Sequence, residues 1–213
     1  MSSTLTRARA AAVAGLKAAY PRRFLQMLVG NGSSIRTYTS AEELILLYEE
    51  ASTCVRNGVF VEVGSHLGAS TVVLAECLRR VSSRRSVPTP VVYCVDTWQN
   101  DAMTEGVRDT FAEFTANTAG WTRLIVPLRG YSSDVSLPFD GDCDLVFIDG
   151  DHSYEGVKLD VERFSPRVRP GGRCVFHDQD RPGVSRVVGE LLVTGRWRVR
   201  AALSRMLSLE RLE

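Results

Sequence analysis

The chain has 213 residues, of which 26 are basic and 25 acidic, and 44% of it is hydrophobic. This length suits a single sizeable α/β core, and the interspersed charges leave no basic face for nucleic acid or an anionic membrane. The five cysteines form no Cys-x-x-Cys pair and no apolar run is long enough to cross a bilayer, so we expect a cytoplasmic protein with reduced, buried thiols.

Helical patterning fills residues 1–52, which we predict to be an N-terminal helical extension, or lid, ahead of a main domain over 53–213. An Arg- and Ala-rich amphipathic helix should end near Tyr20, and a loop rich in Gly and Ser should follow at 30–34. Ser40 and Glu43 have the spacing of a capping box, which predicts the start of another helix. The extension would pack against the sheet or cover the site, and its apolar helices would allow a homo-oligomer.

From residue 59 onward, strand and helix patterns alternate, which predicts an α/β fold with a doubly wound parallel sheet. Apolar stripes with helical spacing begin at Leu74, Val107, Val157 and Val184. Two final strands are separated by only two residues and must therefore be antiparallel. The predicted strands cover 59–63, 91–95, 123–127, 144–148 and 173–176, followed by the hairpin 197–203 and 206–212.

A glycine turn follows the first of these strands. Glycine lets a ligand approach the main chain and a helix start offers free N–H donors, so Gly64 and Gly68 before Ala69 indicate a nucleotide cradle. The pattern Glu-x-Gly-x-x-x-Gly-x-Ser, from Glu62 to Ser70, resembles the first motif of class I S-adenosylmethionine-dependent methyltransferases of the catechol and sugar O-methyltransferase-like branches. A nicotinamide dehydrogenase is disfavoured, because its Gly-x-Gly-x-x-Gly spacing and Tyr-x-x-x-Lys motif are missing.

This resemblance covers about residues 59–192 and implies a Rossmann-like methyltransferase sheet with the last strand beside the fifth. It also implies S-adenosylmethionine as cofactor. Glu62 would anchor its methionine end, with Ser70 near the carboxylate, and Asp96 would accept hydrogen bonds from the ribose hydroxyls. Ser132 and Ser133 would meet the adenine. The remaining residues expected at this cofactor site are Gly64, Ser65, His66, Gly68, Thr97, Trp98 and Asp149. His66 would reach either the cofactor or the acceptor, and Trp98 would either pack on the adenine or cover the sheet.

All three histidines follow the ends of predicted strands, where ligands bind in a doubly wound sheet. The segment 144–178 resembles sugar and antibiotic O-methyltransferases, which implies a divalent cation such as Mg²⁺ held by Asp149 and Asp178, with Gln179 or His177 beside them. Mg²⁺ prefers oxygen ligands, so a histidine here would suit a softer divalent metal better.

Methyl transfer to a hydroxyl requires loss of a proton, and His152, three residues after Asp149, has the chemistry of a general base. The resemblance implies O-methylation of a small-molecule acceptor such as a sugar or secondary metabolite, assisted by metal. Three alternatives stay open: metal-independent O- or N-methylation with His152 as base, a non-catalytic scaffold that binds the cofactor, and a His152 that only helps to start a helix. The N-terminal helices and the loop 98–103 would shape the acceptor site.

Overall fold

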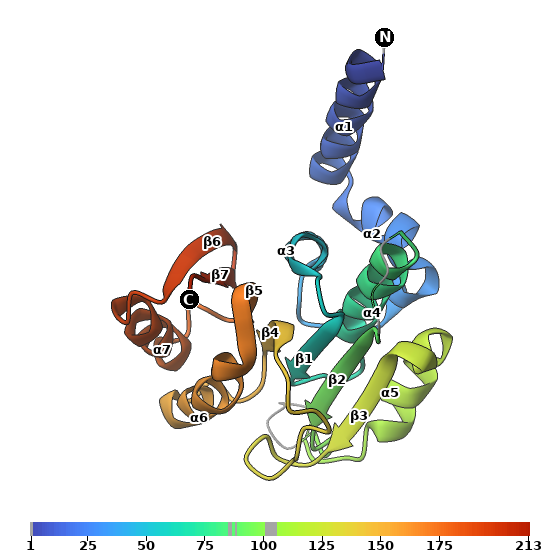
Figure 1. Cartoon of the computed structure of the whole chain (residues 1–213). Helices are drawn as coiled ribbons and strands as arrows, with labels where there is room; N and C mark the ends of the chain where they lie inside the picture. The colour runs from blue at the N-terminus through green and yellow to red at the C-terminus, as the bar shows by residue number, and fades with distance from the viewer. Residues whose placement is uncertain (1, 85–86, 88, 101–105) are drawn as a thin grey trace.

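The computed structural model describes residues 2–84, 87, 89–100 and 106–213 (Figure 1). Its strands correspond closely to those that the hydrophobic pattern predicts. They are β1 Val59–Val63, β2 Val91–Asp96, β3 Ile125–Arg129, β4 Cys143–Ile148, β5 Val168–Phe176, β6 Trp197–Leu203 and β7 Met206–Arg211.

These strands form one seven-stranded sheet in the order β3-β2-β1-β4-β5-β7-β6. Strands β1 to β5 pair in parallel, and β7 pairs antiparallel with both β5 and β6. The predicted parallel sheet with a C-terminal hairpin is confirmed, and so is the position of the last strand beside the fifth.

Two strands, β3 and β5, differ from their predicted bounds by more than one residue. Strand β3 starts at Ile125 because a short 3-10 turn, η2 (Ala119–Leu124), occupies the residues before it. Strand β5 starts at Val168, although Pro170 and the glycines after it suggest a turn. These residues instead form an irregularity in the β4–β5 ladder between the pairs Cys143–Val168 and Leu145–Arg173.

The helices are α1 Ser2–Ala19, α2 Pro21–Val29, α3 Ala41–Cys54, α4 Ala69–Ser82, α5 Phe111–Asn117, α6 Tyr154–Phe164 and α7 Pro182–Val193. The predicted loop at 30–34 is a 3-10 turn, η1 (Gly30–Ser34), and another, η3 (Ser165–Arg167), follows α6. The helix expected from Val107 is wrong at its start, since Val107 is 75% exposed and precedes α5. Backbone donors there bond to the loop after β2 rather than within a helix, as Thr110 N–H does to Trp98 O.

The helices cover the two faces of the sheet, as Figure 1 shows. Helices α3, α4 and α5 contribute to a core with Phe60, and α6 and α7 contribute to a second core with Val61. Side chains alternate along a strand, so β1 directs Glu62 to the same face as Phe60, toward α4. The five cysteines are unpaired and buried, as expected.

In the N-terminal extension, helix α1 projects away from the rest of the fold (Figure 1). Residues 11–19 are mostly exposed, so this described part of the predicted amphipathic helix buries no apolar face. A salt bridge of 2.7 Å from Lys17 to Glu49 connects it to α3. By contrast, α2 and α3 pack on α4 through Leu25, Ile45 and Val73. Among the described residues, no helix has the length and apolarity to span a bilayer.

Candidate active site

The chain changes direction across the sheet between β1 and β4. Strands β2 and β3 lie on one side of β1 and β4 lies on the other, which leaves a crevice at their carboxyl ends. Gly64 and Asp149 follow these two strands and touch there. Gly64 has φ +88°, and a Cβ at this position would lie 2.1 Å from Asp149 O. Only glycine fits this contact, which holds the two loops together.

Glu62 lies under the glycine turn and is fully buried. Its Oε2 accepts hydrogen bonds from Ser65 Oγ at 2.7 Å and from Thr71 Oγ1. The nearby Ser70 and Cys94 also favour the charged form and act to lower the pKa of Glu62. Its Oε1 has no partner among the described residues, and burial raises the pKa of this carboxyl. A buried oxygen without a donor is costly, so the crevice suits a ligand that brings a hydrogen-bond donor to it.

Asp96 joins the loops that follow β1 and β2. Its carboxylate accepts hydrogen bonds from His66 N at 2.8 Å and from Trp98 N at 2.6 Å. The indole of Trp98 is completely buried against Phe111 and Phe114, with ring centroids 5.0 and 4.7 Å away, and Nε1 donates to His66 O. This burial against α5 favours the covering role of the two considered for Trp98, and the role stays a prediction. Thr97 Oγ1 accepts from Gln99 N, which shapes the same loop.

Ser132 and Ser133, after β3, have different surroundings. Ser133 is exposed and bonds to Asp134, whereas Ser132 is half-buried and bonds to Asp160. Asp160 on α6 is 2% exposed, and its Oδ1 has no partner among the described residues. Its other oxygen lies 3.6 Å from where a Cβ on Gly150 would stand. Asp160 therefore lies between the segments that follow β3 and β4, at the edge of the crevice.

We expect Asp160→Asn to change the pH dependence of stability. Burial raises the pKa of Asp160 from 3.8 to about 6, so the folded protein holds this proton more tightly than the unfolded chain does. The resulting stability is complete below about pH 4 and is lost as the pH rises through about 6, a change of about 1–3 kcal/mol. Asp160→Asn has no carboxyl at this position and does not lose this stability. Urea denaturation should therefore show that the variant becomes more stable relative to wild type as the pH rises from about 4 through about 6.

The exposed Asp140 supplies a matched control for that measurement. Asp140→Asn should follow the wild-type profile throughout. If the stabilities of wild type and Asp160→Asn ran parallel from about pH 4 to about pH 7.5, the carboxyl of Asp160 would not carry a raised pKa.

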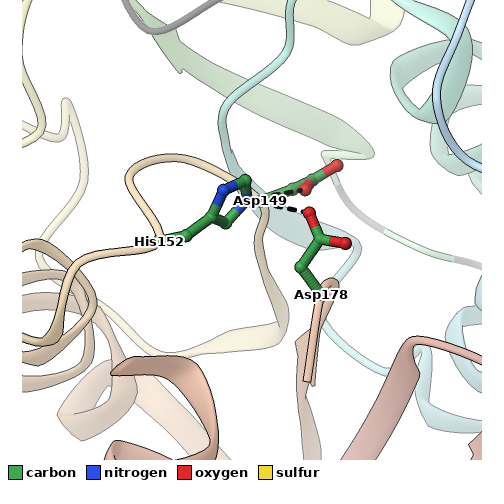
Figure 2. Close-up of side chains that lie close together, drawn as sticks. All are labelled: Asp149, His152 and Asp178. Atoms are coloured by element: carbon green, nitrogen blue, oxygen red, sulfur yellow. Dashed lines mark ion pairs between the residues drawn. The ribbon is translucent and has the colours of Figure 1, made fainter. Parts of the chain in front are cut away.

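Three further side chains, from the segments that follow β4 and β5, lie close together (Figure 2). The ligand atoms of Asp149, His152 and Asp178 all lie within 4.8 Å of one another. His152 Nε2 is 3.1 Å from Asp178 Oδ2 and 3.9 Å from Asp149 Oδ1, yet it meets the geometry of a hydrogen bond to neither. Three potential metal-ligand atoms lie close together here, and His152 Nε2 makes no hydrogen bond to either carboxylate. Such an arrangement is typical of a metal-ion site.

Two basic side chains contact the carboxylates of this site: His177 contacts Asp149 and Arg205 contacts Asp178. His177 is 2% exposed, with Nδ1 3.1 Å from Asp149 Oδ1 and Nε2 3.5 Å from Glu43 Oε2. Burial opposes its charge, but the hydrogen bond to Asp149 and the charges of the nearby acids outweigh burial and raise the pKa of His177 to about 9. Arg205 lies 2.5 Å from Asp178 Oδ1 and also donates to Tyr38 O.

The group formed by Asp149, His152 and Asp178 fits a divalent cation. With two carboxylates and one imidazole, it favours a metal such as Mn²⁺, Fe²⁺ or Zn²⁺ over Mg²⁺. The two other ligands considered, Gln179 and His177, make different contacts. Gln179 donates its side-chain amide to Ser204 O at 3.2 Å, and both ring nitrogens of His177 face carboxylates.

Several residues of this site were not predicted from the sequence. Thr71 follows the glycine motif directly, and a signal for Asp160 exists, because this acid interrupts the apolar stripe between Val157 and Val161. The sequence predicts Glu43 only as part of a helix cap, but in the structure its carboxylate also lies 3.5 Å from His177 Nε2. For Arg205, in the turn of the final hairpin, the sequence contains no signal.

Comparison with known proteins connects this geometry to a family. A family model described as a methyltransferase domain matches residues 61–179, more than half of the chain. The uncharacterized protein y4gI of Sinorhizobium fredii is 28% identical over 122 residues. That match covers 56% of the present chain and 13% of y4gI, so the chain spans only a small part of this relative's length.

Solved structures show the same fold. The O-methyltransferase NovP aligns with a TM-score of 0.67 at 15% identity, over 92% of this chain and 100% of that one. The O-methyltransferase from Bacillus cereus, in complex with SAH, has a TM-score of 0.67 at 14% identity, over 95% and 97% of the two chains. CalS11, a TDP-rhamnose 3'-O-methyltransferase, aligns with a TM-score of 0.59 at 16% identity, over 93% of this chain and 90% of that one. The expected Rossmann-like methyltransferase fold is confirmed.

Proposed function

The chain is a member of the methyltransferase-domain family, and on that basis we propose that it transfers a methyl group from S-adenosylmethionine to a hydroxyl of a small molecule. The observation that carries the proposal is the position of two unsatisfied groups at one crevice. The buried Glu62 Oε1 lacks a donor beneath the glycine turn, and His152 Nε2 faces two carboxylates nearby.

The cofactor would fill the crevice from the glycine turn toward Ser132. Its methionine ammonium would supply the donor that Glu62 Oε1 lacks, a charge-assisted hydrogen bond. Asp96 has one hydrogen bond on each carboxylate oxygen, and each oxygen keeps a lone pair for a ribose hydroxyl. The SAH complex of the Bacillus cereus neighbour supports this choice of cofactor.

A small-molecule acceptor, such as a sugar or secondary metabolite, is supported by the O-methyltransferases NovP and CalS11, the second acting on TDP-rhamnose. Asp149, His152 and Asp178 would hold a divalent cation, which when bound would lower the pKa of the acceptor hydroxyl. His177 and Arg205 keep the two carboxylates oriented through contacts of 3.1 and 2.5 Å.

An alternative chemistry uses the same side chains without metal. His152 is 40% exposed, and Asp149 first, then the charge of Asp178, raise the pKa of its imidazole against the effect of burial. It could then accept the proton of a hydroxyl or amine directly, with Asp178 stabilising the imidazolium. A single nitrogen cannot be ligand and base at once, so the two chemistries exclude each other.

Isothermal titration with S-adenosylmethionine tests the cofactor assignment. Wild type should show one site, and Glu62→Gln should weaken it by about 10–100-fold, because the carboxylate charge facing the ammonium is lost. Glu162→Gln, which changes a carboxylate that is 66% exposed on α6, should bind like wild type. Equal affinity of wild type and Glu62→Gln would remove Glu62 from the cofactor site, and lack of binding by wild type would refute the proposal.

A further inference from the structure

A cavity of about 690 Å³ lies between α2, the segment 32–41 and the first residue of α4. It has the volume of an ordinary small-molecule site. Among the described residues that line it, none is acidic. Its polar side chains are one amide, three guanidinium groups and four hydroxyls, from Gln26, Arg22, Arg23, Arg36, Ser33, Thr37, Thr39 and Ser40.

Arg22 and Arg23 occupy an electrostatically unfavourable place. They stand in the first turn of α2, whose amino-terminal end carries a partial positive charge. This turn has no acidic residue and no side-chain cap, and no acidic residue lines the described part of the cavity beside the two arginines. Both side chains are exposed, so this opposition to the helix dipole is a small cost to the free protein. An anion in the cavity would remove that cost, because the guanidinium groups and the helix end would then attract the same charge.

The walls of this cavity are also walls of the candidate active site. Ala69 directly follows the glycine turn, and Ser40 caps the helix from which Glu43 reaches His177. Tyr38, within the segment 32–41, accepts a hydrogen bond from Arg205, which pairs with Asp178. A molecule held in the cavity would therefore border both the cofactor turn and the group that faces the acceptor.

We propose that this cavity binds a phosphate or diphosphate group of the methyl acceptor, so that the acceptor is a phosphorylated small molecule. The inference deepens the proposed function and rests on it. Guanidinium forks bind phosphate oxygens in pairs, and the hydroxyl residues add further donors. The two charges of Arg22 and Arg23 match a phosphate or diphosphate better than the single charge of a carboxylate. The N-terminal extension thus selects the acceptor by charge.

Inorganic pyrophosphate serves as the probe, titrated by calorimetry into protein saturated with S-adenosylhomocysteine. EDTA is included so that the probe cannot bind through a metal at Asp149, and the saturated cofactor site cannot bind it either. Wild type should bind one pyrophosphate, and the double variant Arg22→Gln, Arg23→Gln should bind it at least about 10-fold more weakly. Its affinity for S-adenosylhomocysteine should stay at the wild-type value, which also shows that the variant is folded.

A control with the same change in charge is Arg56→Gln, Arg196→Gln, since both residues are exposed and outside the cavity. This control should bind pyrophosphate like wild type. The proposal is overturned if pyrophosphate does not bind, if both double variants lose it equally, or if succinate binds as tightly. It is also overturned if a single-stranded oligonucleotide binds far more tightly, which would make the cavity part of a nucleic-acid surface. Failure to bind S-adenosylhomocysteine would instead refute the proposed function.

Discussion

Asp149→Asn should lower kcat/KM for methyl transfer by about 100–10,000-fold, with little change in the affinity for S-adenosylmethionine. The carboxylate of Asp149 lies between two histidines, since His177 Nδ1 is 3.1 Å and His152 Nε2 is 3.9 Å from its Oδ1. Asparagine keeps the shape and removes the charge that binds a cation or orients the imidazole. Mass spectrometry of the methylated acceptor measures the rate, and Asp140→Asn is the exposed control.

Metal removal separates the two proposed chemistries in the same assay. If Asp149, His152 and Asp178 hold a cation, thorough chelation should abolish wild-type activity, and Mn²⁺ should restore it better than Mg²⁺ because one ligand is nitrogen. Activity that survives chelation would assign the proton transfer to His152 instead. Wild-type turnover by Asp149→Asn would contradict both versions.

Gly64→Ala should destabilise the protein by about 2–5 kcal/mol and abolish cofactor binding. The backbone at Gly64 has φ +88°, and the added Cβ would meet Asp149 O at 2.1 Å, so either this loop or the loop after β4 must move. Both loops contribute to the crevice, and their separation would distort it. Urea denaturation and calorimetric titration measure the two effects.

Gly189→Ala provides the comparison for that variant. Gly189 is within α7, and an added Cβ there meets nothing within 4 Å. This exchange should stabilise the protein by about 0.5–1 kcal/mol through the higher helix propensity of alanine. If Gly64→Ala were as stable as Gly189→Ala and bound the cofactor normally, the close contact between the two loops would not exist in solution.

The positions of most elements could be predicted because hydrophobic periodicity is local. β1 and β6 match their predicted bounds, and the capping box of Ser40 and Glu43 forms as expected. Prediction failed where local signals misled. The predicted strand 173–176 is only the end of β5, which starts at Val168. The stripe from Val107 suggested a helix where the backbone bonds to the loop after β2.

The sequence alone determined that the polar residues of this protein lie after the strands of a parallel sheet, because strand and helix periods, glycines and caps are properties of neighbouring residues. Only the tertiary structure decided which of those side chains meet. Glu43 reaches His177 across 134 residues, and Arg205 reaches Asp178 from the final hairpin. Such contacts depend on strand order and on how helices pack on the sheet, and these arise from burial of the whole core rather than from any local segment.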